Sequence, residues 1–395
     1  MRWNKRRKNV LISCCGAHVI QDGLSSTLYV LLPVLAQTFG LSYSQVGILR
    51  ALNNGAMALL EMSSGVLSER FGERNLLAFG LVCSGVGYVV MALSSSLWAL
   101  GACLLIVGIG GAFQHALSSS TVSEAFESDG RRSALGLYNS SGDAGKLIFT
   151  GLFSLLAWLG FAWQSVISVF GGIALVGSGA VFFALYFVGA GSRYPALKPG
   201  KGQFLTGWGI QDKTGFVGLC AAVFLDTAIQ AGFLTFLAFF IVAKQVPMSL
   251  ATLAVTITLV GGMMGKAAGG FLAERMGIRP AFTLVQCLTA CGIIAVLFSG
   301  KVVAFCLLPL LGVCLQGSTS ITYGAVGDLV HKDKVSRGFS IIYSVSSLSG
   351  LLGPIAFGLL SDNYGIETTM LAMTAISLLA IPPIILLRPK IEETK

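Results

Sequence analysis

Several charged side chains lie in parts of this sequence that are otherwise apolar. Hydrophobic residues make up 54% of the 395 residues and charged residues only 11%, about half the charged share of an average soluble protein. One charge at the centre of a bilayer costs about 2.5–3.5 kcal/mol on insertion scales, so such groups are expected to face one another or a wet cavity and to be functional. The ionisable residues well inside long apolar stretches are Asp22, Arg50, Glu61, Asp143, Lys146, Asp226 and Lys266.

His18 and Asp22 have the spacing of a proton-handling pair. They are four residues apart, so a helix places them on one face. An imidazole beside a carboxylate can take up and release protons near neutral pH, and we predict that Asp22 carries a proton and that His18 tunes it. Asp226 and Glu61 are further candidates for proton coupling. A metal ion is the alternative, but it needs more ligands and the chain has three histidines, so neither metal nor cofactor is predicted.

The basic residues inside the spans, Lys266 among them, are candidates for binding a solute. Asp143 and Lys146 are three residues apart and share a helical face. Either they neutralise each other as a local ion pair, or Lys146 meets an anionic group on the substrate. Arg50 binds substrate or extends toward the outer surface, and His115 either contributes to the same site or is a hydrogen-bonded interior histidine.

A charged segment occurs twice. Gly65–Arg74 and Gly270–Arg279 agree at Gly, Leu, Glu-Arg, Gly and Arg, and their offset of 270 − 65 is close to half of the chain. A half-length repeat between apolar segments is typical of secondary transporters built from two similar halves. Glu61 and Lys266 each precede their copy by four residues. They could form an ion pair between the halves that opens and closes, or each could have a separate structural partner.

The apolar stretches predict an all-α integral membrane protein of about twelve spanning helices. Lys and Arg gather in alternate loops, and the opposite loops hold only Lys244 and Lys301. This asymmetry predicts that both termini are cytoplasmic, and it does not indicate nucleic-acid binding. The expected spans are 10–39, 44–67, 75–95, 97–125, 133–160, 163–190, 215–243, 248–272, 280–299, 301–330, 338–361 and 366–388.

These spans predict two pseudo-symmetric bundles of six helices. The expected boundaries are 1–190 for the N-terminal bundle, 191–214 for a cytoplasmic linker and 215–395 for the C-terminal bundle. The intramembrane charges would then face a cavity between the halves near the midplane. The expected setting is the lipid bilayer of the cytoplasmic membrane, and the expected state is a monomer.

The repeated pattern Gly-x-Leu-x-(Asp/Glu)-Arg-x-Gly-x-Arg resembles the signature loop of the major facilitator superfamily. The resemblance implies that its residues lock neighbouring helices in the outward-facing state, while their positive charge also anchors the loop on the inside. Within the superfamily, the His18-x-x-x-Asp22 spacing and the run Gly108–His115 resemble the fosmidomycin-resistance type of efflux protein. The residues assigned to the loops are Gly65, Glu69, Arg70, Gly72, Arg74, Gly270, Glu274, Arg275, Gly277 and Arg279.

Together these patterns predict a proton-coupled secondary transporter of a small polar or amphipathic organic solute. Four acids and three bases lie well inside the spans, a mixture that favours an anion or zwitterion over an apolar cation. The subfamily resemblance implies efflux by proton antiport, and proton-coupled uptake of a small anionic metabolite is the alternative. A membrane-embedded enzyme or a receptor is a remote alternative, because no nucleophile–base constellation stands out. The sequence has no Gly-x-x-x-x-Gly-Lys-(Ser/Thr) loop, so ATP-driven transport is not expected.

Overall fold

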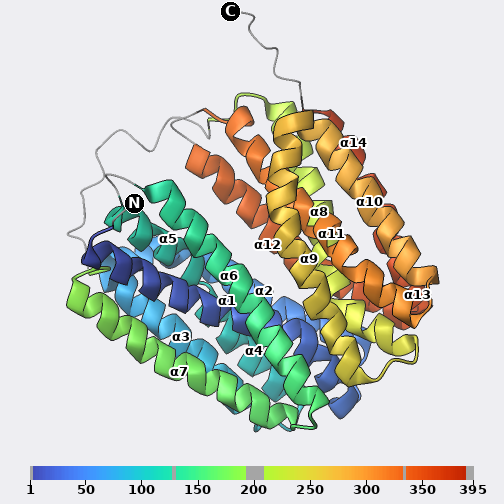
Figure 1. The fold of residues 1–395 in the computed structure, drawn as a ribbon, viewed down its shortest axis with the longest axis horizontal. Helices are drawn as coiled ribbons and strands as arrows, with labels where there is room; N and C mark the ends of the chain where they lie inside the picture. The colour runs from blue at the N-terminus through green and yellow to red at the C-terminus, as the bar shows by residue number, and fades with distance from the viewer. Residues whose placement is uncertain (1–2, 127–129, 193–208, 332–334, 388–395) are drawn as a thin grey trace, which may run out of the picture. The chain divides into compact units, whose positions relative to one another are not determined.

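The structure is a computed structural model that describes residues 3–126, 130–192, 209–331 and 335–387. Over these residues the chain is almost entirely α-helical (Figure 1). The first seven helices are α1 (Lys5–Phe39), α2 (Tyr43–Phe71), α3 (Glu73–Met91), α4 (Leu97–Gly111), α5 (Gln114–Ala125), α6 (Arg131–Trp158) and α7 (Trp163–Val188). The second seven are α8 (Lys213–Ala243), α9 (Met248–Met276), α10 (Ile278–Phe298), α11 (Lys301–Leu329), α12 (Val335–Tyr364), α13 (Ile366–Leu379) and α14 (Ile381–Ile385).

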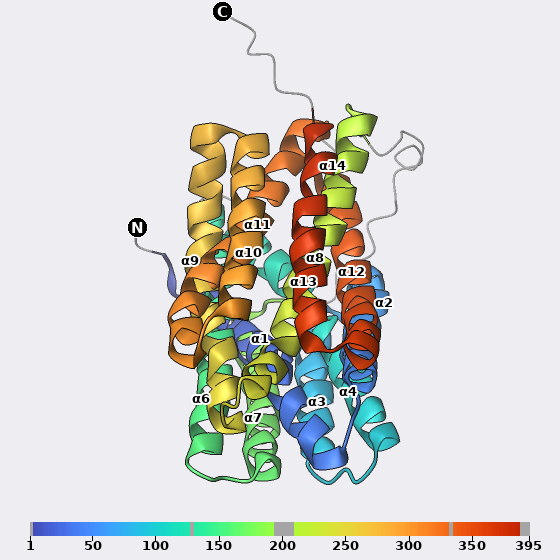
Figure 2. The same cartoon turned by 90° about the vertical axis from the view of Figure 1, so that its right-hand side faces the viewer.

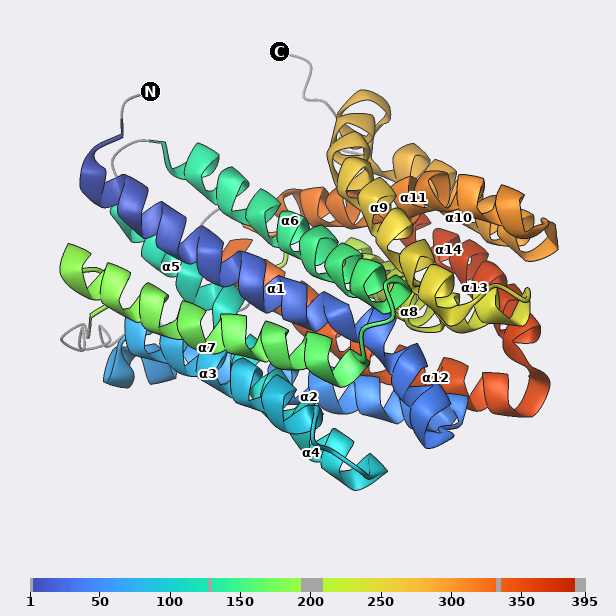
Figure 3. The same cartoon turned by 60° about the horizontal axis from the view of Figure 1, so that its bottom comes forward.

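The chain divides into two compact units. The N-terminal unit comprises residues 1–198 together with 247–253, and the C-terminal unit comprises residues 199–246 and 254–395. In the N-terminal unit α1 packs between α6 and α7, and α3 packs against α4 and α7 (Figure 3). In the C-terminal unit α8 packs against α12 and α13, and α10 packs against α11 and α13 (Figure 2). The same packing scheme thus occurs in both units, which confirms the pseudo-symmetric halves expected from the repeat.

Each unit has an apolar core of its own. Fully buried side chains such as Val10 and Leu185 bring α1 and α7 together in the N-terminal unit. Phe282 and Ile342 contribute to the core of the C-terminal unit. Because each half buries its own hydrophobic cluster, the polar residues described below are held by packing within one unit.

Two of the expected spans are broken in the structure. The span predicted over 97–125 is interrupted at Ala112 and Phe113, so that α5 starts anew at Gln114. Three glycines in the run Gly108–Gly111 precede the break, and glycine is among the weakest helix formers. The last span is likewise divided between α13 and α14, where Pro382 and Pro383 begin the second piece. The first break leaves His115 in the first turn of α5.

Glycines set the distance between several helix pairs. A Cβ atom on Gly145 of α6 would lie 2.2 Å from the carbonyl oxygen of Val19 on α1. On α9, Cβ atoms on Gly261, Gly265 and Gly269 would each lie within about 2.1 Å of a backbone oxygen of α11. Small residues at such positions let membrane helices approach backbone to backbone. The approach of α1 to α6 brings together the two helices that carry Asp22 and Lys146.

The repeated loop forms the same turn in both copies. Gly72 ends α2 with φ 81°, and Gly277 ends α9 with φ 82°, values in the left-handed region that favours glycine. A third turn of this kind occurs at Gly365, with φ 84°, between α12 and α13. The preceding sequence Gly358–Tyr364 shares the Gly-x-Leu-x-acid spacing of the other two. This third copy was not recognised in the sequence, because it lacks the arginines by which the first two were found.

Ten helical segments among the described residues are long and apolar enough to cross a membrane. The two long helices that are not among them are α2 and α6, of 29 and 28 residues. These two helices carry four of the seven intramembrane ionisable residues, namely Arg50, Glu61, Asp143 and Lys146. Their lower hydropathy is therefore a consequence of the polar groups that they bring into the N-terminal unit.

The contact at Gly145 gives a test of the α1–α6 approach. We expect Gly145→Ala to lower the melting temperature of the purified protein, because overpacking a close contact costs about 1–3 kcal/mol. Gly136 lies on the same helix and a Cβ atom there would meet nothing within 4 Å. Gly136→Ala should leave the melting temperature unchanged or raise it, and equal effects of the two variants in detergent would contradict the close contact.

Candidate functional site

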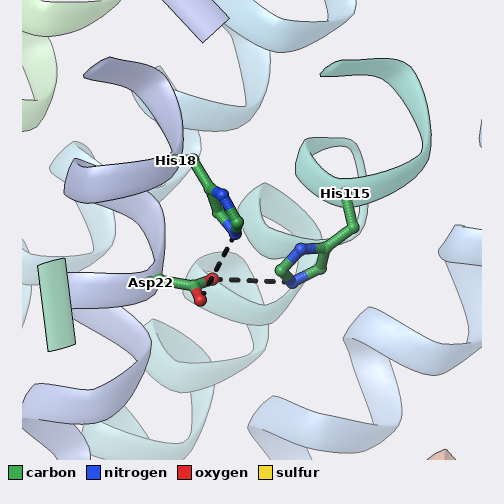
Figure 4. A group of neighbouring side chains, drawn as sticks. All are labelled: His18, Asp22 and His115. Carbon is green, nitrogen blue, oxygen red and sulfur yellow. Dashed lines mark ion pairs between the residues drawn. The ribbon is translucent and has the colours of Figure 1, made fainter. Parts of the chain in front are cut away.

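Three helices of the N-terminal unit bring together a cluster of ionisable side chains. Asp22 of α1 lies 3.4 Å from Nε2 of His18 and 3.5 Å from Nε2 of His115 on α5 (Figure 4). The Nζ atom of Lys146 on α6 lies 3.2 Å from Oδ2 of Asp22 and 3.0 Å from Oδ1 of Asp143. The local pairs expected from the sequence, His18–Asp22 and Asp143–Lys146, are therefore confirmed as contacts. Their joining into one cluster is new.

The tautomer of His18 follows from its backbone partner. Its Nδ1 atom lies 2.9 Å from the carbonyl oxygen of Tyr138 on α6, and a carbonyl oxygen can only accept a hydrogen bond. Nδ1 therefore carries the proton, and the ring stacks on that of Tyr138 with centroids 4.2 Å apart. In the neutral imidazole the lone pair of Nε2 then faces the Asp22 carboxylate. Two acceptors at this distance favour a cation between them, and the smallest such cation is a proton on Nε2.

Gly142 provides the space for this pair. A Cβ atom at Gly142 would lie 2.5 Å from the His18 ring and 2.8 Å from Oδ2 of Asp22. Gly142 lies one position before Asp143 on α6, so the helix that supplies the lysine also supplies the gap for the imidazole. The sequence analysis missed both Tyr138 and Gly142, because neither residue type signals a site unless its neighbours are known.

The cluster runs from buried to accessible groups. The side chains of His18 and Asp22 are 5% and 8% exposed, whereas those of Lys146 and His115 are 27% and 44% exposed. His115 pairs with Asp22 while its side chain stays partly accessible, so its assignment to a solute site or to an interior hydrogen-bonded position stays a prediction. With both imidazoles neutral, two carboxylates oppose one ammonium, so uptake of a single proton by a histidine balances the charge.

Arg50 of α2 forms a second polar site against α1, the helix that also carries His18 and Asp22. The residue is 6% exposed, and its guanidinium donates to the backbone oxygen of Ser25 at 3.1 Å and lies 4.1 Å from the ring centroid of Tyr29. Its Nε is buried without a hydrogen-bond partner, and no described carboxylate lies within ion-pair distance. Ser25 follows Asp22 by three residues, a rise of about 4.5 Å along α1. A buried cation thus stands about one turn from the cluster.

Asp226 in the C-terminal unit has a different environment. It is 4% exposed, and its carboxylate accepts hydrogen bonds from three neutral groups: Gln286 at 2.6 Å, Gln230 at 2.8 Å and Ser318 at 2.9 Å. Ser377 in turn donates to the side-chain oxygen of Gln286 at 2.6 Å. Asp226 is therefore held by amide and hydroxyl donors, whereas Asp22 is held by a cation and two imidazoles. Asp22 and Asp226 lie at roughly corresponding positions in the first helix of each half, but their partners differ in kind.

Glu61 and Lys266 lie in different units. Glu61 is a half-buried residue of α2 in the N-terminal unit, and Lys266 is a half-buried residue of α9 in the C-terminal unit. The two residues lie on α2 and α9, the helices that precede the two copies of the repeated loop. Their pairing between the halves stays a prediction.

The residues of the repeated loops lie at helix ends. Arg74 places its guanidinium 5.2 and 5.0 Å from the ring centroids of Phe182 and Tyr186 on α7, and its backbone N–H donates to Gly191. In the second copy Arg275 lies 4.9 Å from the Phe271 ring. Arg70, Glu274 and Gly277 are exposed, Arg279 and Gly270 are partly buried, and Gly72 is buried. For Gly65 and Glu69 the structure describes the helical backbone alone.

The fold and the charges together define a class of protein, a polytopic membrane transporter. The family model of the Major Facilitator Superfamily matches residues 14–323 and, in a second match, residues 219–395. The chain belongs to this superfamily. Members are transporters and not enzymes, as the sequence predicts.

Curated relatives and solved structures agree with this assignment. An uncharacterized MFS-type transporter of Bacillus subtilis (strain 168), YfnC, is 26% identical over 94% of this chain and 90% of its own. The hexuronate transporter of the same organism is 23% identical over 92% of this chain and 90% of its own. The crystal structure of a bacterial homologue of the human lysosomal transporter Spinster is similar in fold, with a TM-score of 0.82, 16% identity and 98% coverage of both chains.

The joining of Asp22 to Lys146 can be tested by a double-mutant cycle. We expect Asp22→Asn and Lys146→Met each to lower the melting temperature, and the double variant to lose less than the sum, because contacting charges couple by about 0.5–3 kcal/mol. Lys301→Met provides the control, since Lys301 donates to the Gln245 backbone in the other unit. Additive effects in the Asp22–Lys146 cycle, equal to those in an Asp22–Lys301 cycle, would mean that the pair does not form.

Proposed function

We propose that this protein is a proton-coupled transporter of a small organic anion or zwitterion. The observation that carries the proposal is a cluster able to take up one proton, about one helical turn from a buried guanidinium that has no carboxylate partner among the described residues. His18, Asp22 and His115 would bind the coupling proton, with Lys146 and Asp143 setting the local charge. Arg50 would bind an acidic group of the solute.

The charge of Arg50 favours an anion over a cation as the solute. A buried cation is strongly destabilising unless it is paired, and the Tyr29 ring and one carbonyl compensate only part of its charge. Arginine also presents a planar fork of donors that matches a carboxylate. A carboxylate-bearing solute would therefore stabilise Arg50, and a cationic solute would be repelled. The name of the hexuronate transporter, a relative across most of both chains, is compatible with an anionic solute.

The direction of coupling follows from the sign of the charges. A proton bound near Asp22 makes the site more positive and favours an anion at Arg50, so the two ligands assist each other. Mutual assistance suits symport, in which proton and anion move together, and it supports uptake. Efflux by proton antiport, implied by the resemblance of the His18-x-x-x-Asp22 spacing, requires that the two ligands exclude each other. That scheme suits an anion only if proton binding displaces the solute through a change in shape.

The test is proton movement in liposomes that contain the purified protein and a pH-sensitive dye. A hexuronate, a monocarboxylate, a zwitterion and an organic cation are added in turn under an imposed pH gradient. We expect an anion or zwitterion to move protons in the wild type, and Asp22→Asn to abolish this movement. Protons that follow the solute indicate symport, and protons that move against it indicate antiport. The absence of coupled proton movement with every solute, from protein that binds one of them, would contradict the proposal.

Substitution of Arg50 tests the solute site separately. We expect Arg50→Met to weaken binding of the transported anion at least tenfold, because hydrogen bonds to charged groups contribute about 1.5–3 kcal/mol each. Arg50→Lys should recover part of the loss, since it restores charge without the planar fork. Lys301→Met removes a cation near the surface of the other unit and serves as the control. Unchanged affinity in a folded Arg50→Met protein, measured by equilibrium binding, would exclude Arg50 from the site.

A further inference from the structure

We infer that His18, Asp22 and His115 form a binding site for a divalent transition metal ion, of the class of Zn²⁺. The inference concerns a ligand other than the proposed solute. Its test by direct binding does not depend on transport. Only its consequence for coupling rests on the proposed function.

The distances fit the coordination geometry of such an ion. Zinc binds histidine nitrogen and carboxylate oxygen at about 2.0–2.1 Å, which places neighbouring ligand atoms of a tetrahedron about 3.3–3.4 Å apart. The observed separations are 3.4 Å from Oδ2 of Asp22 to Nε2 of His18 and 3.5 Å from Oδ1 of Asp22 to Nε2 of His115, so each imidazole faces its own oxygen of the carboxylate. One ligand atom of each residue lies within 4.8 Å of the other two. Figure 4 shows both imidazoles turned toward the one carboxylate.

The orientation of His18 is a second, independent observation. Its Nε2 atom is buried without a hydrogen-bond partner, on a side chain that is 5% exposed. The other ring nitrogen is held by the Tyr138 carbonyl, which is the arrangement that fixes a metal-binding histidine in the correct tautomer. An unprotonated nitrogen, aimed at a carboxylate and a second imidazole, is already in the form that a metal needs.

The ligand set selects the kind of metal. Two imidazoles with one carboxylate suit Zn²⁺, Ni²⁺, Cu²⁺ or Fe²⁺, whereas Mg²⁺ and Ca²⁺ prefer oxygen ligands alone. Three protein ligands leave a fourth position for water or a solute. The His115 side chain, 44% exposed, lies on the accessible edge of the cluster. Among the three ligands, His115 is therefore the most accessible to an incoming metal ion.

Lys146 competes with the metal for Asp22. Its ammonium lies 3.2 Å from Oδ2 of Asp22, but it also pairs with Asp143 at 3.0 Å. Lys146 can therefore release Asp22 without losing its counter-ion. The competition predicts an effect of unusual sign, in which removal of a charged residue near the site strengthens binding. We expect Lys146→Met to bind the metal more tightly than the wild type.

The binding test uses the full-length protein in detergent, with its purification tag removed. Zn²⁺ is titrated by calorimetry, and Co²⁺ is added in parallel to read the ligand-field absorption of a nitrogen–oxygen site. We expect one Zn²⁺ per chain in the wild type. Loss of an outer-shell partner alone typically costs about 10–100-fold in affinity, so His115→Ala should weaken binding at least tenfold. Asp22→Asn should do the same while keeping the shape of the side chain.

His331 provides the matched control, since it is the third histidine of the chain and lies outside the cluster. His331→Ala should bind Zn²⁺ as the wild type does. Weak wild-type binding that His115→Ala leaves unchanged, or binding that depends on His331, would overturn the inference. So would a Lys146→Met protein that is still folded at the temperature of the titration and binds Zn²⁺ less tightly than the wild type.

The metal and the coupling proton would use the same atoms. Metal ligands must be deprotonated, so binding should weaken as the pH falls. The groups facing Asp22 are His18 on α1, His115 on α5 and Lys146 on α6, with Asp143 behind the lysine. In the liposome assay we expect Zn²⁺ to inhibit proton movement in the wild type and, at the same concentration, in the control His331→Ala. If Zn²⁺ binds without inhibiting proton movement, the metal site is supported, but the claim that the metal and the coupling proton use the same atoms is contradicted.

Discussion

The contact between Asp22 and Lys146 holds the N-terminal site together. Both residues belong to apolar segments, where an unpaired charge is strongly destabilising, and each satisfies the other at 3.2 Å. The pair forms only because α1 and α6 approach closely at Gly145 and Gly142, where a Cβ atom would collide with the facing helix. The glycine contacts between α1 and α6 and the Asp22–Lys146 ion pair therefore depend on each other, because the close approach of the helices brings the two charged groups within ion-pair distance.

The two halves share a packing scheme but not a chemistry. Asp22 is surrounded by an ammonium and two imidazoles, whereas Asp226 is surrounded by amide and hydroxyl donors. Charged partners respond to the arrival of a proton, a metal or an anion, because each changes the balance around the carboxylate. The amide and hydroxyl donors around Asp226 carry no charge, so their own charge does not change when a proton or an ion binds. The two halves therefore share the arrangement of their helices, whereas, in the part of the chain that the structure describes, titratable partners surround the aspartate only in the N-terminal half.

His18 and Asp22 lie on a helix that meets the criterion for a spanning segment, whereas two other helices with charged residues do not. α2 and α6 are not among the ten segments that meet the criterion of length and apolar composition, and they hold Arg50 and Lys146. The break between α4 and α5 similarly interrupts a span just before His115. Polar side chains and interrupted helices are tolerated at membrane depth only where protein or water surrounds them.

The sequence by itself determined the class of fold, the two halves and the local pairs, since all of these rest on spacing along a helix. Apolar length indicates spans, and offsets of three or four residues put His18 beside Asp22 and Asp143 beside Lys146. Only the tertiary structure joined these pairs, added His115 and assigned the tautomer of His18 through the Tyr138 carbonyl. Those contacts link residues about a hundred positions apart, and their geometry depends on glycine contacts between helices. No periodicity in the sequence records which helices approach one another.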